Sequence, residues 1–142
     1  MVRVLTTTLI DIAEFHSTRF APVLPEESQV NPQVYGAELA YWVAQELAKR
    51  GLASSYPESE DWGWYVEWST PEGAEFAFHC GNAEGRKDHW CIALRRFGRK
   101  WFGRDQPPFT DAAEWVDALK ASLEAEPSIT ALKWYGLDSL QA

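Results

Sequence analysis

The chain reads WGWYVEWS over residues 62–69, TPEG over residues 70–73 and AEFAFHC over residues 74–80, and this stretch decides the fold. Its first part is rich in aromatic and β-branched residues, which favour a strand. The Pro-Glu-Gly sequence that follows is typical of a three-residue hairpin loop in which the glycine adopts the left-handed backbone conformation. Such a loop places Trp68 opposite Phe76, so we expect two antiparallel strands in that register.

A third strand is expected over residues 88–95, after a loop around residues 82–86. In the expected register Trp90 lies opposite Phe78. One face of the resulting sheet is then apolar throughout, whereas a slip by one residue would bring polar groups into it. The residues on this apolar face are Trp64, Val66, Trp68, Phe76, Phe78, Cys80, Trp90, Ile92 and Leu94.

The opposite face of the same sheet carries polar side chains from all three strands. The expected register puts Tyr65, His79 and His89 in one row. Hydroxyl, imidazole, thiol and carboxylate groups side by side suit acid–base chemistry or the binding of a transition metal. The spacing matches no zinc motif, so we expect neither a metal nor a catalytic set, and a half-solvated polar face is the simpler interpretation. The candidate binding residues are Tyr65, Glu67, His79, His89, Cys91 and Arg95.

The two cysteines do not form a disulfide framework. Cys80 falls on the apolar face, where we expect an inert core thiol. Cys91 falls on the polar face and is the more plausible reactive thiol, although no base or orienting partner follows from its spacing.

A helix is expected before the sheet, from residue 31 to residue 51. Asn31 is a good N-cap, and Pro32 suits the first helical position. Gly51 suits the position just after the last turn. Apolar residues recur at every fourth position between these ends and predict that one side of the helix covers a core.

A second helix is expected from about residue 110 to residue 125, and a last strand over residues 129–135. Residues 1–30 are expected to be an irregular N-terminal segment. Its apolar residues are compatible with a strand followed by a helical turn, and they are Val2, Val4, Leu9, Ile10, Ile12 and Phe15. The order of the elements predicts an α+β fold. We expect a single domain over residues 1–142, built as a two-layer sandwich: an antiparallel sheet of about four strands with two helices packed on one face.

Charge is segregated along the chain, which carries a net charge of −8. Residues 51–85 hold seven acidic residues and no lysine or arginine, and residues 86–104 hold seven basic residues against one aspartate. One interpretation is that neighbouring strands and loops of opposite charge pair across the surface. The other is that the acidic cluster docks a basic partner protein. The candidate docking residues are Glu58, Glu60, Asp61 and Trp62.

Several classes of protein fit the sequence poorly. The net acidity argues against binding to nucleic acid or to anionic membranes. The basic and aromatic stretch over residues 95–104 suits single-stranded nucleic acid, but a solvated loop is the simpler interpretation. No apolar run is long enough for a signal peptide or a membrane span, so we expect a cytoplasmic location. No cofactor-binding or catalytic motif is present, so we expect no cofactor and favour a protein that is not an enzyme.

Three segments together resemble a pattern in small uncharacterised bacterial proteins. They read NPQVYG over residues 31–36, EDWGW over residues 60–64 and HCGN over residues 79–82. The resemblance spans about residues 20–135 and implies a bacterial cytoplasmic protein. It implies no activity, cofactor or catalytic residue.

These observations lead to two hypotheses about function. The first is a non-enzymatic binding module, similar to an immunity or inhibitor protein, that docks a basic partner through its acidic, tryptophan-rich edge. The alternative is a small-ligand-binding or metal-binding protein, or an enzyme, that uses the polar sheet face around Tyr65, His79 and His89. A homodimer is compatible with both.

Overall fold

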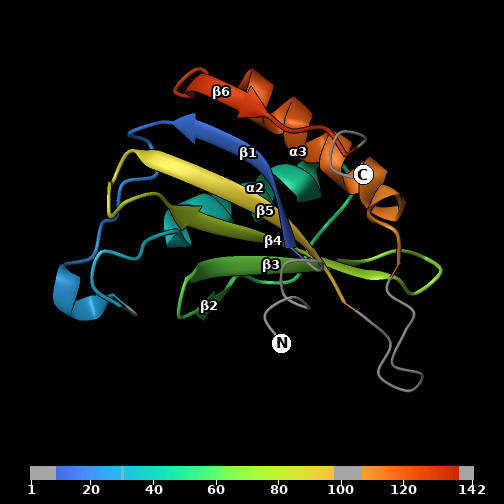
Figure 1. Ribbon diagram of the computed structural model, residues 1–142, viewed down its shortest axis with the longest axis horizontal. Helices are drawn as coiled ribbons and strands as arrows, with labels where there is room; N and C mark the ends of the chain where they lie inside the picture. Colours follow the sequence, from blue (N-terminus) through green and yellow to red (C-terminus); the bar gives the residue numbers. More distant parts are fainter. Residues whose placement is uncertain (1–8, 30, 98–106, 138–142) are drawn as a thin grey trace.

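Figure 1 shows the computed structural model, which describes residues 9–29, 31–97 and 107–137. Six strands form one antiparallel sheet in the order β2-β3-β4-β5-β1-β6. Its elements in chain order are β1 (Leu9–His16), the 3-10 helix η1 (Glu26–Ser28), α2 (Ala37–Lys49), β2 (Glu58–Glu60), β3 (Gly63–Ser69), β4 (Glu75–Asn82), β5 (His89–Arg96), the 3-10 helix η2 (Phe109–Ala112), α3 (Ala113–Ala125) and β6 (Thr130–Trp134).

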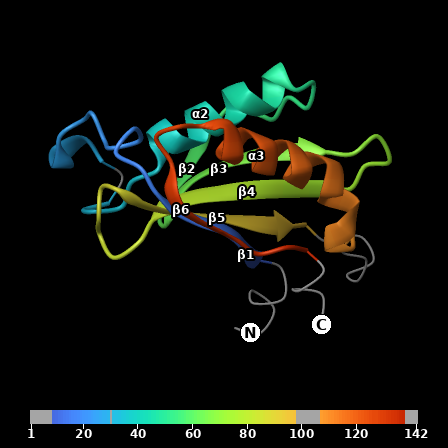
Figure 2. The same ribbon diagram turned by 90° about the horizontal axis from the view of Figure 1, so that it is seen from above.

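Both long helices, α2 and α3, lie on the same face of the sheet, as the view from above shows (Figure 2). The expected α+β fold with an antiparallel sheet and two helices is therefore confirmed. None of the helices among the described residues is long and apolar enough to cross a membrane. The other face of the sheet carries no helix from the described part of the chain and is called the open face below.

The expected number of strands was wrong, because the sheet has six strands rather than about four. One added strand is β1, which lies between β5 and β6 although the segment before residue 30 was expected to be irregular. A bulge between Asp11 and Ala13 makes two consecutive residues, Ile12 and Ala13, buried. This breaks the alternation by which a strand is recognised. The other added strand, β2, is a three-residue acidic edge without an apolar pattern.

The hairpin of β3 and β4 has the expected register. Trp68 lies opposite Phe76, and Val66 lies opposite Phe78. The backbone amide of Thr70 donates to the carbonyl oxygen of Ala74 at 2.8 Å, which closes the three-residue loop.

The register between β4 and β5 differs from the expected one by four residues. Phe78 lies opposite Leu94, not opposite Trp90, because β4 continues to Asn82 before the chain turns. A shift by an even number leaves each side chain on the same face of the sheet. The apolar face was therefore predicted correctly, whereas the rows on the polar face were not.

The first helix begins later than expected. Asn31 and Pro32 precede the helix by a full turn, and α2 starts at Ala37 with Gly36 as its N-cap. Asn31 therefore lies too far from the first turn to cap it, and its Nδ2 donates to the carbonyl oxygen of Asp61 at 2.9 Å. The end is as expected: the backbone amide of Leu52 donates to the carbonyl oxygen of Leu47, as in a Schellman motif.

The core lies between the helices and the sheet. The indole of Trp115 on α3 stacks on Phe78 with ring centroids 3.7 Å apart, and it also stacks on Trp68 at 5.3 Å. Such stacking adds to the burial of apolar area that holds the two layers together. The indole nitrogen of the buried Trp90 donates to the carbonyl oxygen of Ser17 at 2.9 Å, which fixes the chain where it leaves β1.

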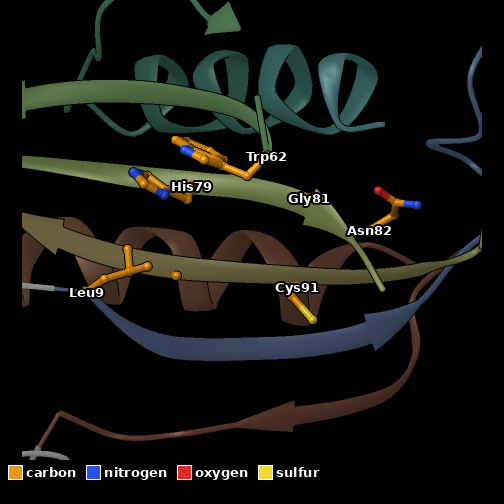
Figure 3. Close-up of a pocket in the computed structure, with 7 residues that line it drawn as sticks. Leu9, Trp62, His79, Gly81, Asn82 and Cys91 are labelled. Atoms are coloured by element: carbon orange, nitrogen blue, oxygen red, sulfur yellow. The ribbon is translucent and has the colours of Figure 1, made fainter. Parts of the chain in front are cut away.

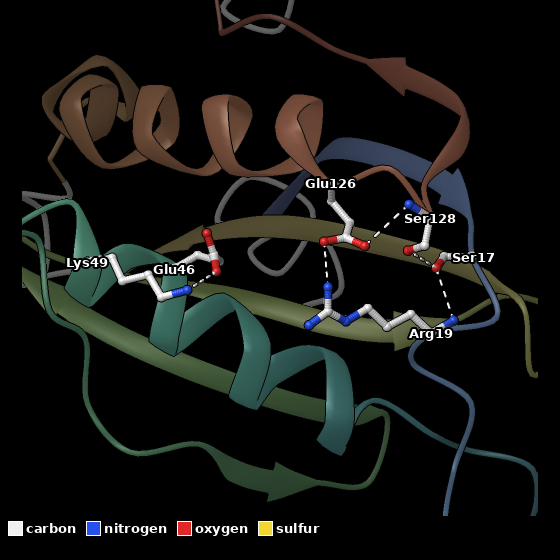
Figure 4. A network of polar contacts seen from close by, with 6 residues as sticks. All are labelled: Ser17, Arg19, Glu46, Lys49, Glu126 and Ser128. Carbon is white, nitrogen blue, oxygen red and sulfur yellow. Dashed lines mark hydrogen bonds and ion pairs between the residues drawn. The ribbon is translucent and has the colours of Figure 1, made fainter.

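A polar network joins the segment after β1 to the segment after α3 (Figure 4). The hydroxyl groups of Ser17 and Ser128 lie 2.8 Å apart, and Arg19 donates to Glu126 at 2.5 Å. These contacts bring residues more than a hundred positions apart into one place and so help to fix β1 in the interior of the sheet.

Two glycines allow other segments to approach the end of β4 closely. A Cβ at Gly36 would lie 2.3 Å from the carbonyl oxygen of Cys80, and a Cβ at Gly63 would lie 2.7 Å from the same oxygen. Both glycines have a positive φ, 153° and 150°, that side chains disfavour. The loop before α2 and the turn before β3 therefore both close on one backbone carbonyl.

We predict that Gly63→Ala lowers the free energy of unfolding by about 1–3 kcal/mol, because it adds both a clash and backbone strain. Urea denaturation measures the change. Gly136→Ala is the matched control, since a Cβ at Gly136 meets no atom within 4 Å. Equal stability of the two variants would contradict the close approach at Cys80.

Candidate functional site

The three segments that carry the sequence pattern meet in space at the end of β4. The loop of residues 31–36 and the turn of residues 60–63 both close on the carbonyl group of Cys80. Asn82, two residues further on, accepts a hydrogen bond from the backbone amide of Tyr35 at 2.9 Å. These contacts make the residues of the three segments parts of one junction.

The side chain of Asn82 holds the junction together through both the nitrogen and the oxygen of its amide group. Its Nδ2 donates to the carbonyl oxygens of Gln33 at 3.0 Å and Arg86 at 2.9 Å, while its Oδ1 accepts from Tyr35. The side chain thus replaces three backbone partners that a regular strand would supply. We conclude that Asn82 has a structural role and is not available to a ligand through these atoms.

The junction places the indole of Trp62 over the imidazole of His79. Trp62 follows Asp61 in the two-residue turn between β2 and β3, where Glu60 pairs with Gly63. The two rings are nearly parallel, with an interplanar angle of 11° and centroids 3.8 Å apart. Figure 3 shows the rings lying one over the other on the open face of the sheet. Trp62 still keeps 41% of its surface exposed.

His79 is held in its neutral form. Burial under Trp62 and its neighbours lowers the pKa of the imidazole to about 4, and the positive charge of Arg95 acts in the same direction. The Nε2 atom of the ring is buried and has no hydrogen-bond partner among the residues that the structure describes. A buried polar atom without a partner costs roughly 1–3 kcal/mol, so the packing around this ring must compensate for it.

A hollow of about 170 Å³ lies beside the stacked rings on the open face. Its floor is made of small residues on β4 and β5, namely Gly81, Cys91 and Ala93. Trp62 and His79 line it together, as do Leu9 and Asn82. Small side chains on a sheet between larger ones leave a depression, and here the depression is mostly apolar.

The expected row of Tyr65, His79 and His89 forms only in part. Tyr65 lies opposite His79, and its hydroxyl donates to Glu58 Oε1 at 2.7 Å, which raises the pKa of Tyr65 to about 12. The residue opposite His79 on β5 is Ala93, so His89 lies four residues away along the strand, roughly 13 Å. The three side chains therefore cannot act on one small ligand.

His89 belongs instead to a second polar group, between β5 and β1. Its ring stacks on that of His16 with centroids 4.3 Å apart. Its Nε2 lies 2.6 Å from Glu14 Oε2, and the hydrogen bond to His89 is the main cause of the lowered pKa of Glu14. This group could not be predicted from the sequence pattern, because the pattern did not place β1 beside β5.

The other candidate binding residues on the open face lie apart from one another. Glu67 and Arg95 share a row, with Ala77 between them. Cys91 lies opposite Gly81, whereas the expected pairing of Trp90 with Phe78 would have put it opposite Ala77. Burial raises the pKa of the Cys91 thiol to about 11, and the carboxylates of Glu14 and Asp11 also contribute. Cys91 is thus protonated at neutral pH, which argues against a reactive thiol.

The candidate docking residues occupy the β2 edge of the sheet. Glu58 and Glu60 lie on β2 itself and are exposed, and Asp61 and Trp62 form the turn that follows. The ion pairs among the described residues are Arg19–Glu126, Lys49–Glu46 and Arg86–Asp88, and His89 contacts Glu14. None of them joins an acidic residue of residues 51–85 to a basic residue of the described residues 86–97. The basic positions 98–104 lie outside the described residues.

Within the described ranges, no group of three or more His, Cys, Asp or Glu residues is placed to hold a metal ion. Comparison of the whole chain with protein-family profiles, with curated proteins and with solved structures finds no match. The assignment of a function therefore depends on the geometry and charge of the described residues.

We predict that His79 remains neutral down to about pH 4, whereas an unfolded histidine titrates near 6.5. The unfolded state binds more protons between these values, so the free energy of unfolding is highest above pH 6.5 and falls as the pH drops toward 4. NMR titration of the imidazole protons measures the pKa, and urea denaturation across the same pH range measures the linked stability. His79→Phe should remove this part of the pH dependence.

Trp62→Ala should raise the pKa of His79 toward its ordinary value, because removing the indole admits water to the imidazole. Trp68→Phe on the opposite face is the control and should leave this pKa unchanged. Titration of His79 near pH 6.5 in the unmodified chain would contradict the stacked arrangement.

Proposed function

We propose that the chain is a non-catalytic binding module that docks a basic partner protein at its β2 edge, in the manner of an inhibitor or immunity protein. The observation that carries this proposal is an exposed acidic edge that has no ion-pair partner among the described residues and that presents a half-exposed tryptophan. The docking residues are Glu58, Glu60, Asp61 and Trp62.

Electrostatics support a basic partner. Exposed carboxylates that belong to no ion pair keep their charge open to solvent, and their field steers an oppositely charged protein toward them. The carboxylates of this edge affect the neighbouring Tyr65. The hydrogen bond to Glu58 is the main cause of the raised pKa of Tyr65, and the charges of Glu67 and Glu60 raise this pKa further. An acidic edge without internal counter-charges favours association with a basic surface.

The form of the edge favours docking through side chains. The strand β2 has only three residues, and two of them are glutamates. Short, charged edge strands resist the addition of another strand, because each added strand would bury their charges. A partner is therefore expected to meet the carboxylates and the indole, and not to extend the sheet.

Trp62 is suited to be the energetic centre of this surface. Tryptophan is the residue type most enriched where interfaces derive most of their affinity. Its stacking on His79 fixes the indole before the partner arrives, and such preorganisation reduces the entropy lost on binding.

The alternative site formed by Tyr65, His79 and His89 has less support. His89 is engaged with Glu14 and His16, a strand segment away from His79. A set of three side chains that cannot contact one small molecule together gives no basis for a shared chemical step.

We predict that the triple variant Glu58→Lys, Glu60→Lys, Asp61→Lys loses its partner. The tagged chain is used to capture proteins from a lysate of the organism that carries it, at low salt, and bound proteins are identified by mass spectrometry. The matched control is the triple variant Glu72→Lys, Asp117→Lys, Glu124→Lys, which makes the same change in net charge at other exposed positions.

The proposal is supported if a basic polypeptide is retained by the unmodified chain and the control but not by the edge variant, and if added salt releases it. Retention by all three proteins, or the absence of any basic polypeptide at low salt, would contradict docking at the β2 edge.

A further inference from the structure

We infer that the hollow beside Trp62 is the subsite for one arginine side chain of the basic partner. The identity of the occupant as part of a protein rests on the proposed function, but the chemistry of the hollow can be tested separately. The inference is carried by the size of the hollow, by the indole that lines it and by the charges around it.

The size of the hollow suits a guanidinium group. Its volume is about 170 Å³, and it is lined mainly by apolar surface. A cavity of roughly 150 Å³ with apolar walls holds one benzene molecule. A guanidinium has fewer heavy atoms than benzene and is equally flat, so it fits together with its last methylene group. The floor of Gly81, Cys91 and Ala93 leaves room for this group against the sheet.

The indole of Trp62 offers the surface on which a guanidinium binds best. Arginine stacks on aromatic faces, and tryptophan is the strongest partner among the aromatic residues. One side of the indole is occupied by the ring of His79 at 3.8 Å, yet 41% of the residue remains exposed. The imidazole beneath is neutral, so no positive charge on it opposes the arriving cation.

Two carboxylates act on the floor of the hollow. Cys91 lies on this floor, and the carboxylates of Asp11 and Glu14 on β1 both raise the pKa of its thiol, after the larger effect of burial. Asp11 lies directly opposite Ala93, is exposed and belongs to no ion pair of the described residues. Glu14 already interacts with His89, so Asp11 is the carboxylate most available to a guanidinium.

Arg95 is the charge that acts in the opposite direction. It contributes to the lowered pKa of His79, so its field reaches the rings that line the hollow. Its guanidinium lies over the ring of Phe97, 4.7 Å from the centroid, in the row next to that of His79. Removal of Arg95 should therefore strengthen the binding of a cation, whereas removal of Asp11 should weaken it.

The test uses small probes in place of the partner. Acetyl-arginine amide is titrated into the chain labelled with 5-fluorotryptophan, and fluorine NMR follows the Trp62 resonance, which is assigned from its absence in Trp62→Phe. Acetyl-citrulline amide has the same shape without the charge and is the matched probe. We expect a saturable shift of the Trp62 signal by the arginine probe at millimolar concentrations and at least roughly tenfold weaker binding of the citrulline probe, equivalent to about 1.4 kcal/mol.

Three variants locate the site. Ala93→Leu fills the floor of the hollow and should abolish the shift without a change in charge. Asp11→Asn should weaken the arginine probe and Arg95→Gln should strengthen it, while Glu72→Gln in the hairpin loop at the other end of β4 should have no effect. Circular dichroism establishes that each variant is folded, and the two charge variants test the inference even if Ala93→Leu is unstable.

The outcomes separate the two proposals. Equal binding of the arginine and citrulline probes, or no shift of Trp62 with either, overturns the arginine subsite even if the β2 edge variant loses the partner. A specific response to the arginine probe with unchanged partner capture by the edge variant supports the subsite and overturns the docking edge.

Discussion

The carbonyl group of Cys80 is the point on which the rest of the site depends. Two glycines, Gly36 and Gly63, approach it where no side chain could, one from the loop before α2 and one from the turn before β3. Because both segments close on the same strand end, the turn that carries Trp62 has a single position relative to His79. A backbone constraint at the end of β4 thus sets a side-chain arrangement on its open face.

The functional surface follows from this constraint and from an uneven distribution of charge. The acidic residues of the β2 edge have no ion-pair partners in the described part of the chain, and the indole next to them is held in place by stacking on a neutral imidazole. A fixed aromatic ring among hydrated carboxylates is suited to a basic surface. The apolar hollow behind the ring adds a place for one long, flat, charged side chain.

Sequence patterns predicted the elements with regular periods and failed where the period is broken. The β3–β4 hairpin was predicted to the residue because the Pro-Glu-Gly loop allows one register. The shift of four residues between β4 and β5 escaped detection because apolar alternation distinguishes odd shifts from even ones but not one even shift from another. The strand β1 was expected to be irregular because its bulge buries Ile12 and Ala13 in succession.

The same limits explain which parts of the candidate site could be predicted from the sequence. The pairing of Tyr65 with His79 and the exposure of Glu58, Glu60 and Asp61 follow from local sequence. The hollow does not, because its floor and walls come from three strands and a turn, and their contact depends on the long-range register. Asn31 was interpreted as a helix cap, which is a usual role of such a residue, but α2 begins only at Ala37 and the side chain of Asn31 donates to the carbonyl oxygen of Asp61.

The most direct test of this account is a nuclear Overhauser measurement between the ring protons of Trp62 and those of His79 in the unmodified chain. The stacked arrangement predicts strong cross-peaks between the indole and the imidazole, together with upfield shifts of the imidazole protons caused by the indole ring current. An indole without contacts to His79, and imidazole protons at the positions of an exposed histidine, would contradict it. In that case neither the preorganised docking surface nor the hollow beside it would stand.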